Sequence, residues 1–288
     1  MRVVSLLPGA TEMVAALGRL ESLVGVTHEC DHPPHVASRV RVTRRAEHAG
    51  APFFEIFEDR IRGLRPDLIL TQALCKVCAV IEGDVRALAA RLDPVPQIVT
   101  CAGRSLDGVF EDLRRVADAL DANDECDELL AGAAARMRTV HETLKSARAP
   151  RLRVAVLEWG EPIMSAGHWM PEMVNRAGGI DVLAAPGDHS VPVLVERVRA
   201  ADPEVIIIAP CGYDLPRAVA EGERMLARKE WGWLRARRVF AMDANAFATR
   251  PGPRLVDGIE ILARCFNPSL FSPAEPTFVR QLTSGATP

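Results

Sequence analysis

The sequence has few aromatic residues and no strong charge of either sign. Phe, Trp and Tyr make up 5% of the 288 residues, with a single tyrosine, and the formal net charge is -3. A chain so close to neutral, with a pI near 6.2, has no general attraction for nucleic acid or for an anionic membrane surface. We therefore expect a small-molecule ligand and no nucleic-acid partner.

Long apolar runs are also absent. No segment approaches the roughly 18 apolar residues that a membrane helix requires, so membrane insertion is not expected. The apolar stretch Met1–Leu7 is interrupted by Pro8 and Gly9, which makes it too short for a secretory signal. Seven cysteines, an odd number, are typical of a reducing compartment. These features predict a cytoplasmic location, or a periplasmic or surface-anchored one if an export segment has been removed.

Catalytic motifs with a known mechanism are missing too. The sequence contains no GxxxxGK(S/T) phosphate loop, no GxGxxG and no GxSxG nucleophile turn. These motifs would indicate nucleotide hydrolysis, dinucleotide binding or serine hydrolase chemistry. With no nucleophile–base pair evident, we predict that the protein is not an enzyme.

Apolar, β-branched runs alternate with helical segments in both halves of the chain. The predicted strands are Arg2–Leu7, Leu23–Thr27, Asp67–Thr71, Gln97–Thr100, Arg153–Trp159, Val205–Ala209 and Arg238–Met242. Such alternation indicates β-α-β units and parallel sheets. Between the halves, Asp124–Ala147 repeats apolar residues at three- and four-residue steps, which predicts one helix of roughly 36 Å.

This pattern predicts an α/β fold with two lobes. Each lobe has a parallel-type sheet flanked by helices, one long helix joins the lobes, and a ligand cleft lies between them. We place the N-terminal lobe at residues 1–120, the linking helix at 121–149 and the C-terminal lobe at 150–267, followed by an irregular tail at 268–288 that is rich in Pro, Ser and Thr. Ligands of parallel α/β sheets bind at the carboxyl ends of the strands.

Five of the seven cysteines follow predicted strands. They are Cys30, Cys75, Cys78, Cys101 and Cys211. Because strand ends share one rim, these thiols and His28 are candidate ligands for a zinc or iron ion or an iron–sulfur cluster. Cys75 and Cys78 form a CxxC pair, which also suits a thiol-redox enzyme. The alternative is that the cysteines are small buried apolar residues, which we favour for Cys126 and Cys265 on predicted helices.

Several stretches, spread over nearly the whole chain, resemble the cobalamin and iron-siderophore substrate-binding proteins of ABC importers. They are Arg2–Glu12, Val24–Pro34, Leu64–Leu70, Trp159–Pro162, Ser165–Gly167, Asn175–Ile180 and Pro253-Arg254. These proteins belong to the helix-linked class of periplasmic binding proteins, and the chain is most similar to the corrinoid-binding members. The resemblance implies a metal-bearing ligand in the cleft: a cobalamin-like corrinoid, a siderophore or haem.

The resemblance also implies ligand contacts. An aromatic residue that clasps the corrinoid in the family matches Trp159. Two other such positions hold Gln72 and Thr100, and a family tyrosine is replaced by Glu29. Each lost aromatic contact removes on the order of 1–3 kcal/mol of binding free energy, so we expect a more polar cleft here.

Further ligand contacts are predicted in the second half from side-chain chemistry. His168 and Trp169 precede a helix and could cover a planar ligand or supply an axial group to its metal. Tyr213 and Phe247 follow strands and are expected to face the cleft. Arg250, in a loop stiffened by prolines, could bind a carboxylate or phosphate. The alternative for Trp169 is a place in the core.

Two acidic residues are candidates for partner docking. Family members carry one acid on each lobe that binds arginines of the ABC permease, and local matching places these acids at Glu82 and Glu196. The alternative is that both are exposed helix acids without a partner.

Overall fold

The chain folds into two compact units. The computed structural model describes residues 1–46, 54–74, 80, 82–273 and 275–284. Unit 1 comprises residues 1–103, 107–132 and 251–253, and unit 2 comprises residues 104–106, 133–250 and those from Arg254 onward. The segment 251–253 packs within unit 1 so closely that a Cβ on Gly9 would lie 2.3 Å from the carbonyl oxygen of Pro251. Gly9 therefore permits a contact between distant parts of the sequence.

Unit 1 is built on a parallel sheet with the strand order β3-β2-β1-β6-β7. Its strands are β1 (Val3–Ser5), β2 (Leu23–Val26), β3 (Val40–Arg41), β6 (Leu68–Gln72) and β7 (Gln97–Cys101). A separate antiparallel pair joins β4 (Thr43–Arg45) to β5 (Phe54–Ile56). The helices are α1 (Pro8–Ala16), α2 (Glu58–Leu64), α3 (Glu82–Ala89) and α4 (Leu106–Ala119).

The core of unit 1 forms around the two central strands. Val3 and Val4 in β1 and Leu68 to Leu70 in β6 are fully buried, as expected for strands covered on both faces. Ile61 of α2 and Leu88 of α3 belong to the same apolar cluster as Val4. These two helices therefore cover one face of the sheet.

Unit 2 contains a sheet with the main strand order β10-β8-β11-β12-β13, and β9 pairs with β8. Its strands are β8 (Leu152–Gly160), β9 (Ile163–Ser165), β10 (Gly179–Asp181), β11 (Val205–Ile208), β12 (Arg238–Met242) and β13 (Val279–Ser284). The pairings among β10, β8, β11 and β12 are parallel, whereas β9 and β13 are antiparallel to their neighbours. The helices are α6 (Met170–Arg176), α7 (Val195–Ala200), α8 (Leu215–Ala227), α9 (Ala244–Phe247) and α10 (Leu255–Phe266). The predicted α/β fold with two lobes and parallel sheets is confirmed.

The C-terminal segment differs from the prediction. An irregular tail was expected from residue 268, but β13 pairs with β12 from Met242 opposite Val279 to Arg238 opposite Ser284. Backbone hydrogen bonds to an open sheet edge need no strong apolar pattern in the added strand. The tail composition therefore did not reveal the strand.

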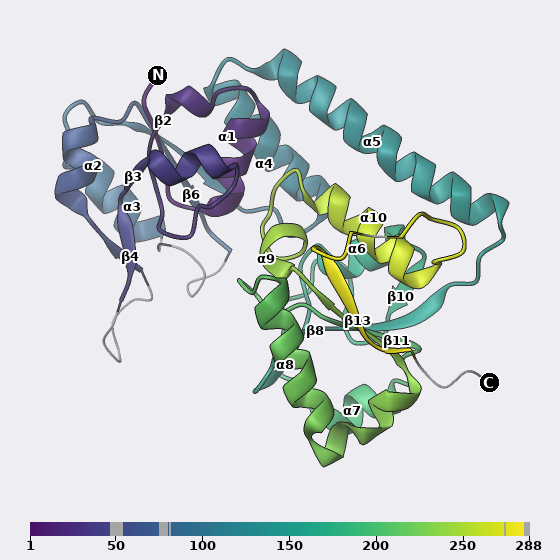
Figure 1. Cartoon of the computed structure of the whole chain (residues 1–288). Helices are drawn as coiled ribbons and strands as arrows, with labels where there is room; N and C mark the ends of the chain where they lie inside the picture. The colour runs from purple at the N-terminus through teal and green to yellow at the C-terminus, as the bar shows by residue number, and fades with distance from the viewer. Residues whose placement is uncertain (47–53, 75–79, 81, 274, 285–288) are drawn as a thin grey trace. The chain divides into compact units, whose positions relative to one another are not determined.

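A long helix, α5 (Asn123–Ser146), has 24 residues and begins in unit 1 and ends in unit 2 (Figure 1). It matches the helix predicted at 124–147. Within unit 2, Arg136 donates to Asp257 and to Glu260, with 2.9 Å between Arg136 Nε and Glu260 Oε1. The guanidinium lowers the pKa of Glu260, so this pair attaches α5 to α10. No helix in the described part of the chain is long and apolar enough to cross a membrane.

Candidate functional site

The carboxyl edge of the unit 2 sheet carries most of the predicted ligand residues. β8 ends beside Trp159, β11 is followed by the turn that holds Tyr213, and β12 leads into α9 with Phe247. His168 lies between β9 and α6. This edge is where α/β sheets bind ligands, so unit 2 brings these candidates to a suitable place.

Trp159 and Tyr213 form an aromatic pair at this edge. Trp159 is 36% exposed, and its ring meets that of Tyr213 edge to face, with centroids 5.3 Å apart. The guanidinium carbon of Arg217 lies 3.9 Å from the centroid of the Tyr213 ring, within the range of a cation–π contact. The edge therefore offers an exposed indole beside a positive charge. Arg217 was not predicted, because its position in the first turn of α8 gave no sign of this contact.

Two other predicted contacts have their rings in the core. Trp169 is 6% exposed and Phe247 is 7% exposed. Trp169 Nε1 donates to the carbonyl oxygen of Ala248 at 2.7 Å, and the Phe247 ring lies 4.7 Å from that of Phe278. Both rings hold the segment after β12 in place, which agrees with the core alternative for Trp169.

Arg250 lies in the same segment and is buried, with 7% of its surface exposed. It acts electrostatically on Asp243, the N-cap residue of α9, whose Oδ1 accepts from Ala246 N at 2.9 Å. Burial raises the pKa of Asp243, although this hydrogen bond, Arg254 and Arg250 lower it. Arg250 therefore stabilises its own loop. The guanidinium that lies beside the exposed aromatic pair is that of Arg217.

His168 stands next to a second imidazole. Its ring centroid lies 5.3 Å from that of His189, with the rings nearly perpendicular at 89°. Burial, followed by the charges of His189 and Arg104, lowers the pKa of His168. These effects therefore favour the neutral form of His168.

Two of the predicted rim cysteines, Cys30 and Cys101, do not open onto a rim, and for them that prediction was wrong. Cys30 is 1% exposed and Cys101 is 0% exposed. The Cys30 sulfur lies 3.1 Å from Thr11 Oγ1 and 3.2 Å from Thr27 Oγ1. Burial raises the pKa of Cys101 to about 12, so its thiol stays protonated and is a poor metal ligand. Free cysteine behaves here as a small core residue.

The remaining cysteines give no metal site among the described residues. Cys126 and Cys265 are buried on helices, as predicted, and Cys211 is half-buried after β11. The predicted CxxC pair, Cys75 and Cys78, lies outside the described residues. Within the described ranges, no group of three or more His, Cys, Asp or Glu could hold a metal ion. The thiol-based alternatives therefore gain no support.

At the carboxyl edge of the unit 1 sheet, three predicted residues have local partners. His28 Nδ1 lies 2.9 Å from Thr43 Oγ1, and its Nε2 lies 3.3 Å from Glu29 Oε1. Gln72 is 6% exposed, and its Oε1 accepts from Leu74 N at 2.5 Å. These contacts organise turns at the strand ends.

Residues 28–32 read His-Glu-Cys-Asp-His and match the HExxH motif of zinc sites, which was not predicted from the sequence. The motif binds zinc when both histidines lie on one face of a helix. His28 and Glu29 instead form a turn after β2, and the peptide bond from His32 to Pro33 is cis. The segment therefore lacks the conformation that the motif requires.

The two predicted docking acids lie in the first turns of helices. Glu82 begins α3, accepts from Thr100 Oγ1 at 2.9 Å and pairs with Arg86. The hydrogen bond from Arg86 lowers the pKa of Glu82. Glu196 is exposed in the first turn of α7. A negative charge in the first turn of a helix is favoured by the helix dipole, so both acids suit their positions without a permease partner.

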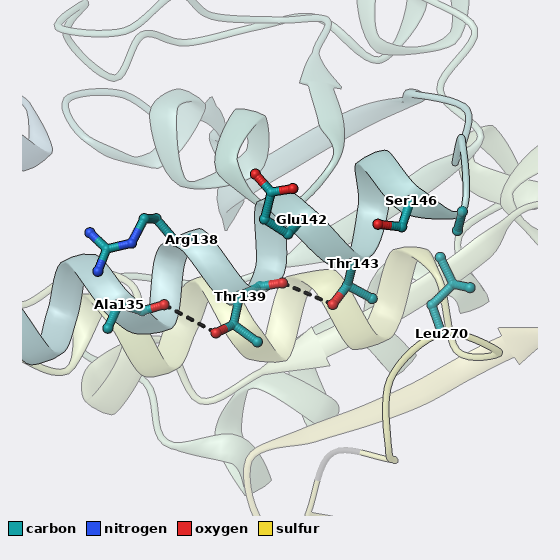
Figure 2. A pocket seen from close by; sticks show the side chains of 8 residues that line it. Ala135, Arg138, Thr139, Glu142, Thr143, Ser146 and Leu270 are labelled. Atoms are coloured by element: carbon teal, nitrogen blue, oxygen red, sulfur yellow. Dashed lines mark hydrogen bonds between the residues drawn. The ribbon is translucent and has the colours of Figure 1, made fainter.

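A groove in unit 2 runs along α5 (Figure 2). Its lining residues are Ala135, Arg138, Thr139, Glu142, Thr143, Ser146, Ala147 and Leu270. Thr139 and Thr143 donate to the carbonyl oxygens of Ala135 and Thr139 within the helix. The groove has no aromatic surface and no metal-ligating cluster, so it is a weaker candidate than the sheet edge.

The family model described as Periplasmic binding protein matches residues 3–246. The chain is 27% identical over 265 residues to a vitamin B12-binding protein of Vibrio cholerae, covering 90% of this chain and 86% of the relative. It is 24% identical over 283 residues to an ABC transporter substrate-binding lipoprotein, YvrC, of Bacillus subtilis, covering 94% and 81%.

The fold is similar to that of a periplasmic heme binding protein from Pseudomonas aeruginosa. The TM-score is 0.77 at 20% identity, and the match covers 99% of both chains. These relatives are periplasmic proteins or lipoproteins, so the predicted cytoplasmic location was wrong and an extracytoplasmic one is indicated. The error arose because a short apolar start was used to judge export. With its family model matched over residues 3–246, the chain belongs to the periplasmic binding protein family.

Proposed function

We propose that this protein is the substrate-binding component of an ABC importer and binds a metal-bearing small molecule: a cobalamin-like corrinoid, a siderophore or haem. The observation that carries the proposal is the exposed Trp159 ring, held by Tyr213 at the carboxyl edge of the sheet. An aromatic face of this kind stacks on flat apolar rings.

The charge near this aromatic pair bears on the choice of ligand. Arg217 packs on Tyr213, and its guanidinium can bind a carboxylate of the ligand. The polar residues Gln72 and Thr100, at positions where the family has aromatic residues, reduce the stacking surface for a corrinoid. A ligand with carboxylates, such as haem or a carboxylate siderophore, is therefore expected to bind beside Arg217 more tightly than a ligand without them.

Titration with cobalamin, cobinamide, haemin and ferric siderophores, followed by visible absorption and calorimetry, tests the proposal. Replacing Trp159 by Ala removes a contact worth about 1–3 kcal/mol, so we expect roughly 5- to 150-fold weaker binding. Leu194→Ala is the matched control, because Leu194 is an apolar residue of unit 2 that is 72% exposed. If none of the ligands binds, or if Trp159→Ala binds as the control does, the proposal fails.

We also propose that Glu82 and Glu196 dock on the permease of the importer. Each is an acid in the first turn of a helix, one in unit 1 and one in unit 2. Glu196→Arg should reduce ligand uptake by cells that carry the cognate permease, while ligand binding in solution stays unchanged. Glu223→Arg, on α8, serves as the control for a reversed surface charge. Equal uptake by the two variants would remove Glu196 from the interface.

A further inference from the structure

The loops that carry His168 and His189 are fastened to each other in unit 2. His168 N donates to the carbonyl oxygen of Asp188 at 2.5 Å, and Gly187 N donates to that of His168 at 2.9 Å. A Cβ on Gly167 would lie 2.4 Å from Ser190 N, so only glycine allows this approach. The backbone thus holds the two imidazoles next to each other.

The backbone at His168 is itself unusual. Its φ is 55°, in the left-handed region that residues other than glycine seldom occupy. Its Nε2 is buried and has no hydrogen-bond partner among the described residues. A buried polar atom without a hydrogen-bond partner destabilises the folded state. Such an atom in a strained loop is a candidate for binding a ligand.

The separation of the rings suits a shared metal ion. With a metal–nitrogen bond of about 2.1 Å, each ring centroid lies about 3.2 Å from the ion. Two imidazoles on one ion then have centroids about 4.5 Å apart at a right angle and about 5.2 Å apart at a tetrahedral angle. The observed separation of the centroids is 5.3 Å. His189 is exposed on its loop, so its ring can turn to bring a nitrogen toward the ion.

We propose that His168 and His189 together ligate the metal of a bound chelate at two adjacent coordination positions. This inference rests on the proposed function, because it assigns the part of the site that would hold the metal of the ligand. No third protein ligand stands beside the pair within the described residues, so the remaining positions must be filled by the chelator. A tetrapyrrole leaves only positions on opposite faces of its ring, whereas an open chelate leaves adjacent ones.

The charges around the pair specify the chelate further. The positive charge of Arg104 acts on the position of His168. This charge disfavours a bare cation and attracts an anion. The expected ligand is therefore an anionic complex of a transition metal with carboxylate groups.

Nickel(II) nitrilotriacetate is a suitable probe, because it is anionic and leaves two adjacent positions free. Binding to the full chain without a histidine tag would be measured by calorimetry. We expect His168→Asn and His189→Asn each to weaken binding at least tenfold, since the second imidazole binds as an intramolecular ligand. Asparagine tolerates the left-handed conformation at residue 168. His141→Asn, an exposed histidine of α5, is the control and should bind as the wild type does.

The outcomes separate this inference from the proposed function. If either variant of the pair binds the nickel chelate as tightly as the wild type, the two-imidazole site is refuted. The same holds if His141→Asn weakens binding as much as they do. Arg104→Gln should weaken binding of the anionic chelate and strengthen binding of free nickel ion, and the reverse order would contradict the assigned ligand class. Titration of Trp159→Ala with haemin and cobinamide tests the aromatic site separately.

Discussion

Gly258 on α10 gives a sharp test of how unit 2 holds the segment after β12. A Cβ at this position would lie 2.1 Å from the carbonyl oxygen of Phe247 and 2.6 Å from Met173 Cε. Real Cβ atoms do not approach a backbone oxygen this closely, so α9 or α10 must move. Glycine inside a helix is normally unfavourable by about 1 kcal/mol relative to alanine. Its presence here is explained by the packing of three helices.

Gly258→Ala is expected to destabilise the protein. Overpacking in a dense core costs about 1–3 kcal/mol, and the contact with a main-chain atom places this variant toward the upper end. After the gain in helix propensity of about 1 kcal/mol, we expect a net loss of about 2 kcal/mol in the free energy of unfolding. Because Phe247 lies at the ligand edge of unit 2, binding should weaken as well.

The matched control is Gly132→Ala on α5. Gly132 is also inside a helix, but no heavy atom lies within 4 Å of its added Cβ. This variant should gain about 1 kcal/mol of stability. Urea unfolding followed by circular dichroism measures both changes, and the two variants should shift the midpoint in opposite directions. If Gly258→Ala is as stable as the wild type, the close packing of α10 on α9 is wrong.

Three further changes test other parts of the structure. Burial raises the pKa of Asp181 from 3.8 to about 7, although hydrogen bonds from two backbone N–H groups lower it. Between these two values the folded state therefore keeps a proton that the unfolded state releases. The free energy of unfolding of the protein should fall by up to roughly 4 kcal/mol between pH 4 and pH 7. Asp181→Asn should remove this pH dependence, which urea unfolding at several pH values measures. Asp112 is fully buried and accepts from Gly103 N at 2.8 Å. Asp112→Ala leaves this backbone N–H unpaired and should lower the free energy of unfolding by about 1–3 kcal/mol, whereas a loss under 1 kcal/mol would contradict this role. Trp169→Phe should cost about 1–2 kcal/mol through the lost hydrogen bond, and an unchanged unfolding curve would show that this bond contributes nothing.

Some features of the protein followed from the sequence alone. Alternating apolar strands and helices predicted two α/β halves and the long helix α5, because hydrophobic periodicity reflects burial directly. The stretches around Leu7 and Trp159 pointed to the family, and Trp159 was predicted as a ligand residue and is exposed at the sheet edge. Each of these patterns lies within a short stretch of sequence, so it predicts structure without knowledge of contacts between distant residues.

Other features were decided only by the tertiary structure. Cys30 and Cys101 follow strands as expected, but their thiols turn into the core, since the direction of one side chain after a strand depends on the helices that cover it. The pairing of His168 with His189 and the contact of Arg217 with Tyr213 join residues with no shared motif. Sequence spacing predicts which face or edge a residue occupies, whereas the distance between two side chains is set by how separate elements pack together.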